Sequence, residues 1–219
     1  QKTAYELLRS LVGSEMCIRD GFRAVRLAAG ESETVATGTR ELCVVILTGT
    51  VDVTIDGKTF ANLGTRNSVF EEVSPAAVYV PAGRTVSVRA SRDSEVAMCT
   101  APGGSAAGAV RVLDPATMRR SVRGKGTNTR YVCDILPHDD PTAAHLLVVE
   151  VLTPASHSSS YPPHKHDVHN MPAEADLEEI YYYRIYPEDG FGLQRLHTAD
   201  GSVDEAYVIH DGDLAGGVV

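Results

Sequence analysis

Two histidines stand two positions apart in the stretch YPPHKHD, residues 161–167. In an extended chain, residues i and i+2 project to the same face, so His164 and His166 point one way and Lys165 points the other way. The two preceding prolines favour that geometry, because proline fixes φ and biases the residue before it toward extended backbone. Imidazoles on Cα atoms about 6 to 7 Å apart can share a divalent cation. The spacing indicates part of a metal site, and its alternative is a polar turn with solvated histidines.

A cation needs a further ligand, and Glu178 and Glu179 begin a strand-like segment, LEEIYYYRI, after the histidines. Strand alternation lets only one of the two carboxylates share the face of the histidines. If Glu179 faces inward, the first and third tyrosines of the YYY run accompany it, and if Glu178 does, the second tyrosine does. The pattern does not choose between them. Four further histidines are expected at the surface or beside the ligands: His157, His169, His197 and His210.

Composition and charge exclude several classes of protein. The 219 residues carry a formal net charge of −9 with no long basic stripe, which argues against nucleic acid and anionic membranes as partners. No apolar run approaches the about 20 residues that span a bilayer, and the N-terminus lacks the layout of a secretory signal. The four cysteines are scattered and never form CxxC, which favours buried thiols in a reducing compartment. We therefore expect a cytoplasmic protein.

Short strands and tight turns dominate the chain. Residues 21–101 contain a strong hairpin signal at Asp56-Gly57 and a turn at Pro81-Ala82-Gly83 between strand-like runs. Residues 102–110, PGGSAAGAV, resemble a linker, and residues 111–219 form a second strand-rich region. Many short strands with almost no helical periodicity predict an all-β protein of two tandem antiparallel β-barrels or jelly rolls.

The two ends of the sequence differ from the rest. Residues 1–20 include SLVGSEMCIRD, which resembles a translated sequencing adaptor, so we expect a non-native extension without a functional role. At the other end, GDLAGGVV places an apolar run directly after a turn, as at the beginning of a core strand. We therefore expect that the second barrel is incomplete at the C-terminus.

Several segments together resemble a known family. SSSYPPHKHD, LEEIYYYRIYPEDGFGLQRLHT and DEAYVIHDGD are similar to the 5-deoxy-glucuronate isomerases of myo-inositol catabolism, in the cupin-like hexuronate isomerase group. ELCVVILTGTVDVTIDG, LGTRNSVFE and AVYVPAG fit in the first half, so the resemblance covers residues 21–219. It implies a double cupin whose first barrel lacks metal ligands. It also implies a divalent metal, zinc or manganese, in the second barrel.

The resemblance also implies a ligand set. His164 and His166 match its histidine pair, and Glu179 matches its glutamate because it directly precedes Ile-Tyr-Tyr-Tyr. A further histidine is expected in a Gly-Tyr-His-Pro-like segment beyond Val219, in which case this chain holds an incomplete site and the fragment can be inactive. The segment between His166 and Glu179 is longer than in a typical cupin, and we expect it to form a rim or lid.

The implied activity is an aldose-ketose isomerisation of a sugar acid, 5-deoxy-D-glucuronate to 5-dehydro-2-deoxy-D-gluconate. Arg184 and Arg195 are candidates to bind the substrate carboxylate, because a guanidinium matches two oxygens, and their alternative is a solvated surface position. Lys165 and Tyr182 are candidates to move protons. Exposed strand edges allow association into a homo-oligomer. The competing functions are 4-deoxy-L-threo-5-hexosulose-uronate ketol-isomerase, from the same group, and a non-catalytic cupin that binds a sugar or a metal.

Overall fold

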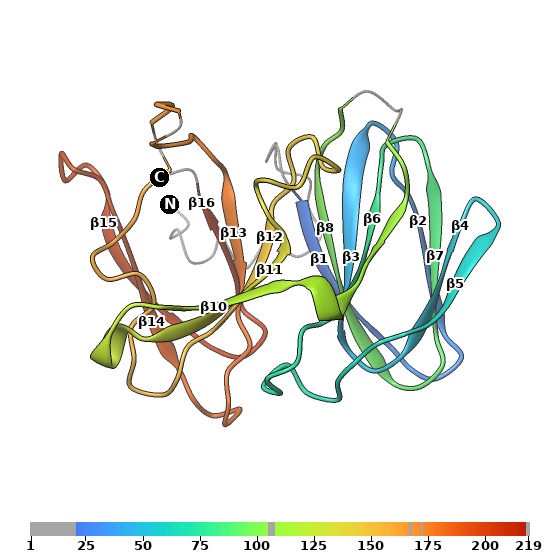
Figure 1. The fold of residues 1–219 in the computed structure, drawn as a ribbon. Helices are drawn as coiled ribbons and strands as arrows, with labels where there is room; N and C mark the ends of the chain where they lie inside the picture. Colours follow the sequence, from blue (N-terminus) through green and yellow to red (C-terminus); the bar gives the residue numbers. More distant parts are fainter. Residues whose placement is uncertain (1–20, 105–107, 167, 172, 218–219) are drawn as a thin grey trace, which may run out of the picture. The chain divides into compact units, whose positions relative to one another are not determined.

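The main regular elements of the structure, a computed structural model, are β-strands (Figure 1). The described residues contain no α-helix, only two 3-10 turns, so the expectation of an all-β chain is confirmed. No helix among them has the length and apolarity needed to cross a membrane. The extension expected at residues 1–20 lies outside the described residues, which are 21–104, 108–166, 168–171 and 173–217.

The chain divides into two compact units, one from Asp20 to Tyr161 and the other containing the residues from Pro162 onward. The division falls directly before the two histidines. The domain boundary that the sequence pattern predicts at residues 102–110 does not coincide with it and stays a prediction. Each unit has its own sheets and is described by itself.

Two antiparallel sheets form the body of the first unit. The first has the order β1-β8-β3-β6-β9, and the second has the order β2-β7-β4-β5. The strands of the first sheet are β1 (Gly21–Leu27), β3 (Arg40–Thr48), β6 (Ala76–Val80), β8 (Ser94–Pro102) and β9 (Arg111–Leu113). Those of the second are β2 (Ser32–Ala36), β4 (Val51–Ile55), β5 (Lys58–Leu63) and β7 (Thr85–Ala90).

A single hydrophobic core joins these two sheets. Leu42, Val44 and Ile46 of β3 pack in the same buried cluster as Val51 and Val53 of β4. The alternation of buried and half-buried residues along β4 matches the period of two that the sequence shows. The core therefore forms where the alternating apolar residues of both sheets face each other.

The expected turns are present. Asp56 and Gly57 both have positive φ, 48° and 85°, and they connect the paired strands β4 and β5. Positive φ at both central residues is the geometry that favours Asp-Gly in two-residue hairpins, so this prediction is confirmed. Gly83, with φ of 79°, ends the Pro81-Ala82-Gly83 turn between β6 and β7.

A third sheet completes the first unit, with β11 (Arg130–Leu136) between β10 (Arg119–Arg123) and β12 (Val148–Leu152). Glu41 of β3 holds the segment that precedes β12. Its side chain is buried, and its carboxylate accepts the backbone N–H groups of Ala144, His145 and Leu146 at 2.9, 2.7 and 2.6 Å. The Tyr79 hydroxyl donates to the same carboxylate at 2.7 Å. Four donors thus compensate the burial of this charge.

Arg66 makes a second buried connection to β12. Only 1% of its surface is exposed, and it donates to the carbonyl oxygens of Leu47 and Val73 at 2.9 and 3.1 Å. Both terminal nitrogens of Arg66 contact the Glu150 carboxylate, Nη1 at 2.7 Å from Oε1. Such a bidentate pair fixes geometry as well as charge. Glu41 and Arg66 therefore make the region around β12 part of the first unit.

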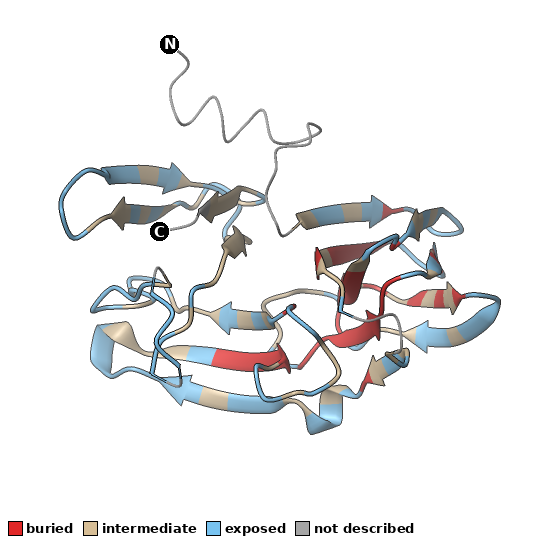
Figure 2. Ribbon diagram, turned by 90° about the horizontal axis from the view of Figure 1, so that it is seen from above, coloured by how far each residue is buried: buried red, intermediate tan, exposed pale blue. Residues whose placement is uncertain are grey.

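The second unit contains the two histidines and two small antiparallel sheets. β13 (Glu179–Tyr182) pairs with β16 (Leu214–Gly217), and β14 (Gly192–His197) pairs with β15 (Asp204–Ile209). None of the described residues from 162 to 216 is fully buried, whereas the strands of the first unit contain many buried residues (Figure 2). Strand pairing and local hydrogen bonds therefore carry more of the stability of the described second unit than a closed core does.

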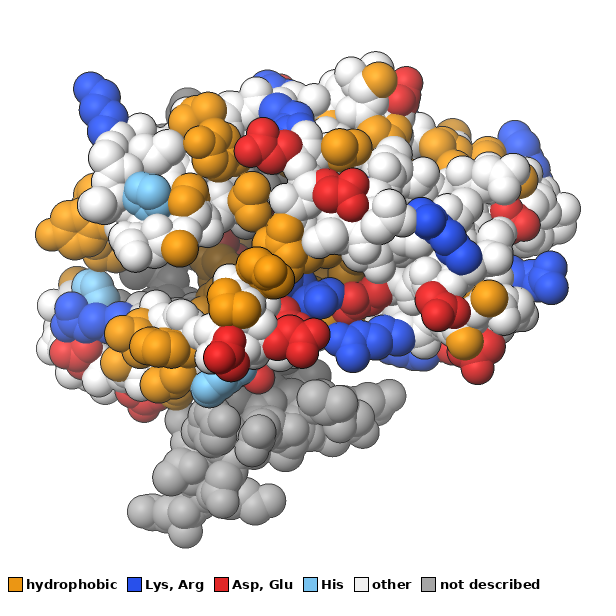
Figure 3. Space-filling view, turned by 90° about the horizontal axis from the view of Figure 1, so that it is seen from below, with side chains coloured by type: hydrophobic (Ala, Val, Ile, Leu, Met, Phe, Trp, Pro, Cys, Tyr) orange, Lys and Arg blue, Asp and Glu red, His pale blue; other side chains and the backbone are white. Residues whose placement is uncertain are grey.

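The β14–β15 hairpin presents two different faces. Leu193 and Val208 are paired directly across the strands on the outer face, where they are 73% and 48% exposed. Gln194 follows Leu193 and so points to the opposite face. Figure 3 shows hydrophobic side chains together with charged side chains of both signs on the face seen from below.

Glu41→Gln tests the buried carboxylate. The amide of glutamine presents an N–H donor to other donors, and its remaining oxygen is a weaker acceptor than a carboxylate. We expect a loss of about 2 to 4 kcal/mol in the free energy of unfolding, measured by urea denaturation. Glu72→Gln, an exposed change of the same type, should stay within about 0.5 kcal/mol of the wild type. Equal stability of the two variants would contradict this role of Glu41.

Candidate metal centre

One backbone hydrogen bond sets the register of the histidines against β13. The Leu177 N–H donates to the His166 carbonyl at 3.0 Å, which closes the intervening loop. Counting two residues back from His166 and two forward from Leu177 reaches His164 and Glu179. These two side chains meet, with His164 Nε2 at 3.1 Å from Glu179 Oε2. The pairing of extended segments therefore explains why a histidine and a glutamate distant in sequence become neighbours.

The spacing of the three side chains is compatible with one cation. Each of them offers one ligand atom, these three atoms lie within 4.8 Å of one another, and the rings of His164 and His166 are 5.1 Å apart at their centroids. Two donors that each bind a cation at about 2.1 Å are about 3.0 to 3.4 Å apart in adjacent positions, and at most about 4.2 Å apart. The His164–Glu179 distance already falls in that range. Donor atoms at the full 4.8 Å would have to approach by about 1.4 Å to take adjacent tetrahedral positions.

The chemistry of the donors also fits a divalent metal. Two imidazoles and one carboxylate suit zinc, manganese or iron. The side chains of His164 and Glu179 are 42% and 38% exposed, so solvent and small molecules reach the group. Three protein donors leave coordination positions for other ligands. His164, His166 and Glu179 could therefore hold a metal ion whose remaining positions are accessible.

The structure decides which glutamate joins the histidines. Glu179 faces them, and alternation along the strand places Glu178 on the other side. The tyrosines at the first and third positions of the YYY run, Tyr181 and Tyr183, share the face of Glu179. Their rings stack with centroids 5.9 Å apart and an interplanar angle of 13°.

Tyr181 contacts the candidate ligands directly. Its hydroxyl oxygen lies 3.4 Å from His164 Nε2. Burial raises the pKa of Tyr181, and its hydrogen bond to the Glu179 carboxylate and the negative charge of that group raise this pKa further. Burial and the charge of Glu179 also raise the pKa of Tyr183. Both phenols are therefore neutral O–H donors at neutral pH.

Lys165 and Tyr182, the residues predicted to move protons, have neighbours outside the metal group. Lys165 Nζ is 3.5 Å from Glu174 Oε2, in the loop between the histidines and β13. Tyr182 alternates with Tyr181 and so points to the opposite face of β13, where its register partner is Leu214. Catalytic roles for Lys165 and Tyr182 stay predictions, and these contacts do not place them beside the metal group.

The two arginines predicted to bind substrate have acidic partners. Arg184 Nε is 2.9 Å from Asp211 Oδ1, and the same oxygen accepts the Ile185 N–H. Arg195 binds Asp204 through two nitrogens, at 2.7 and 3.0 Å, on the outer face of the β14–β15 hairpin. Binding of a substrate carboxylate by Arg184 or Arg195 stays a prediction, and it would require either guanidinium to share or exchange its present partner.

Tyr181 is the residue at this site to which the sequence interpretation assigned no role. The signal was present in the sequence, because choosing Glu179 as the ligand also selects Tyr181 by strand alternation.

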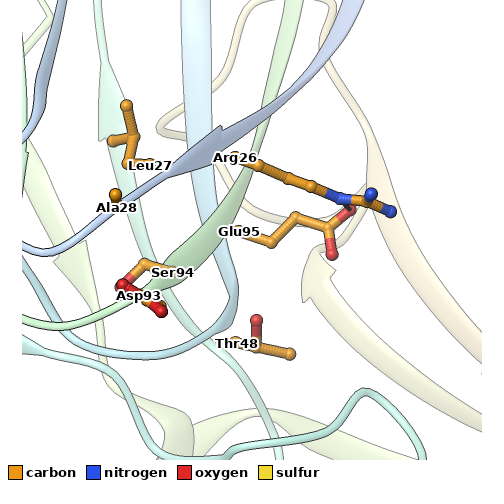
Figure 4. A pocket seen from close by; sticks show the side chains of 7 residues that line it. All are labelled: Arg26, Leu27, Ala28, Thr48, Asp93, Ser94 and Glu95. Atoms are coloured by element: carbon orange, nitrogen blue, oxygen red, sulfur yellow. Dashed lines mark ion pairs between the residues drawn. The ribbon is translucent and has the colours of Figure 1, made fainter.

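A surface hollow in the first unit has a different character (Figure 4). Its volume is about 380 Å³, and it contains an Arg26–Glu95 ion pair with 3.8 Å between Nε and Oε1. No histidine or cysteine lines it, so its lining does not resemble the histidine-glutamate group. The lining residues are Arg26, Leu27, Ala28, Thr48, Asp93, Ser94 and Glu95.

A known protein family matches most of the chain. Residues 12–216 match the sequence profile of the KduI/IolB family, and this range includes both histidines and Glu179. The chain belongs to the KduI/IolB family. The resemblance to that group noted in the sequence is therefore confirmed.

Family members with assigned names are similar over most of the chain. The 5-deoxy-glucuronate isomerase of Geobacillus thermodenitrificans (strain NG80-2) is 42% identical over 194 residues, which cover 89% of this chain and 70% of the relative. The 5-deoxy-glucuronate isomerase of Bacillus subtilis (strain 168) is 41% identical over 188 residues, covering 86% and 69%.

A solved family structure has the same fold. The crystal structure of an IolB-like protein from Salmonella typhimurium LT2 superimposes with a TM-score of 0.86 at 41% sequence identity. The match covers 90% of this chain and 74% of the Salmonella protein. The arrangement of strands described here is therefore that of the KduI/IolB family.

Removing one imidazole tests the metal centre. We expect the purified protein to bind Zn²⁺ or Mn²⁺, and His164→Ala to weaken binding at least a hundredfold in isothermal titration calorimetry, because two donors hold a cation poorly. His197→Ala, on the outer face of β14, is the matched control and should bind like the wild type. Unchanged affinity in His164→Ala, with the protein folded by circular dichroism, would rule out the proposed ligand.

Proposed function

We propose that this member of the KduI/IolB family is a 5-deoxy-glucuronate isomerase that converts 5-deoxy-D-glucuronate to 5-dehydro-2-deoxy-D-gluconate with the help of a divalent cation. The observation that carries the proposal is the convergence of His164, His166 and Glu179 in a chain whose named relatives are 5-deoxy-glucuronate isomerases. The proposal includes the double-cupin architecture and the cytoplasmic location expected from the sequence.

The chemistry of the reaction explains the need for such a site. An aldose becomes a ketose when hydrogen moves from a hydroxyl-bearing carbon to the adjacent aldehyde carbon and the hydroxyl proton moves to the aldehyde oxygen. Negative charge develops on oxygen on the way. A cation held by the three donors would act as a Lewis acid and stabilise that charge by on the order of several kcal/mol. Because only Glu179 among the three carries a negative charge, the ligand set leaves a divalent site net positive.

The protein's own groups have separate tasks. His164, His166 and Glu179 hold their donors toward one point, and their partial exposure leaves room for a sugar acid. Tyr181 is a neutral phenol and adds no further negative charge to the site. We keep Arg184 and Arg195 as proposed carboxylate binders, and Lys165 and Tyr182 as proposed proton carriers, on the chemistry of their side chains alone.

The isomerase assay uses the purified protein. We expect it to isomerise 5-deoxy-D-glucuronate, to lose activity in EDTA and to regain it with Mn²⁺ or Zn²⁺. Glu179→Gln should lower kcat/KM by about a hundredfold or more, because it removes a charged ligand. Glu178→Gln, one position away on the opposite face, is the matched control and should retain activity.

Two results would overturn this proposal. Turnover of 4-deoxy-L-threo-5-hexosulose-uronate but not of 5-deoxy-D-glucuronate would assign the protein to the ketol-isomerase activity. Binding of metal and sugar acid without turnover of either substrate would assign it to the non-catalytic class.

A further inference from the structure

A column of three side chains connects the candidate metal centre to the neighbouring sheet. The Tyr181 hydroxyl lies beside His164 and Glu179, and the ring of Tyr181 stacks on that of Tyr183. The Tyr183 hydroxyl in turn donates to Gln194 Oε1 of β14 at 3.0 Å. The column therefore runs from the candidate ligands beside Tyr181 to the face of the β14–β15 hairpin that carries Gln194.

The backbone holds this column in place. Tyr181 pairs with Ala215 of β16. Beyond the strand, the Tyr183 N–H donates to the Asp213 carbonyl at 2.9 Å, and the Gly212 N–H donates to the Tyr183 carbonyl at 2.8 Å. Both tyrosines are thus fixed at the main chain, and stacking restricts their rings.

A positioned O–H group is what a metal-binding carboxylate needs. A carboxylate can rotate, and a hydrogen bond from a neutral donor fixes which oxygen faces the cation. The Tyr181 hydroxyl oxygen lies 3.4 Å from His164 Nε2, and that nitrogen lies 3.1 Å from Glu179 Oε2. Phenylalanine at this position would keep the stack and remove only the donor.

We propose that Tyr181 is a positioning residue for the metal centre, that its hydroxyl orients the Glu179 carboxylate toward the cation, and that Tyr183 and Gln194 hold it there. This inference rests on the metal centre of the proposed function, although it does not depend on which sugar acid the protein isomerises. Tyr181 can take this role because it shares the face of Glu179, whereas Tyr182 points to the opposite face of β13.

The test measures metal affinity in the absence of any substrate, by competition for Zn²⁺ and Mn²⁺ with a chromophoric chelator of known affinity. Tyr181→Phe should bind the cation about 10 to 100-fold more weakly than the wild type, the loss typical of removing a hydrogen bond to a metal ligand. Tyr182→Phe removes the same group from the other face of β13 and should stay within about twofold. The melting temperature of the metal-free Tyr181→Phe protein should be unchanged, which a general loss of structure would not allow.

Several results overturn the inference. Wild-type metal affinity in folded Tyr181→Phe would overturn the inference and leave the proposed isomerase activity untouched. An equal loss of metal affinity in Tyr182→Phe would have the same consequence. A wild-type protein that takes up neither cation would overturn both the inference and the metal-assisted function. If Tyr181→Phe does not fold, Gln194→Leu removes the acceptor of Tyr183 instead. It should weaken binding at least threefold, and unchanged affinity would overturn the inference.

Discussion

The hydrogen bond between the Leu177 N–H and the His166 carbonyl determines the geometry of the metal centre. It brings the histidine segment beside the start of β13, where His164, His166 and Glu179 each offer a ligand atom within 4.8 Å of the others. Closing the loop between them costs entropy, and the two prolines before His164 restrict the segment that leads into the loop. A shift of one residue in this register would place Glu178 opposite His164 and turn the carboxylate of Glu179 away from the histidines.

The two units of the chain rely on different interactions. The first has a continuous apolar core between two sheets, and the buried charges of Glu41 and Arg66 connect further segments to it. The described part of the second unit has no fully buried residue, and its strands are short. Functional segments often come from the less stable part of a protein. A bound cation would link the histidine segment to β13 and stabilise the unit by mass action.

Local patterns predicted much of this structure. The strands, the Asp56-Gly57 hairpin and the shared face of the two histidines follow from period-two alternation and turn chemistry, which involve neighbouring residues only. The choice between Glu178 and Glu179 needed the pairing of separate segments, which the pattern did not supply. The partners of Arg184 and Arg195 and the buried contacts of Arg66 are equally non-local, and sequence spacing carries no information about them.

The central claim is that two imidazoles and one carboxylate, brought together by this register, bind one cation. X-ray absorption spectroscopy at the zinc edge of the Zn²⁺-loaded protein tests it most directly. The account predicts a coordination sphere of nitrogen and oxygen at about 2.0 to 2.2 Å with the outer scattering of two imidazoles, and loss of part of that imidazole signal in His166→Ala. A sphere of sulfur ligands, or one unchanged in His166→Ala, would contradict it.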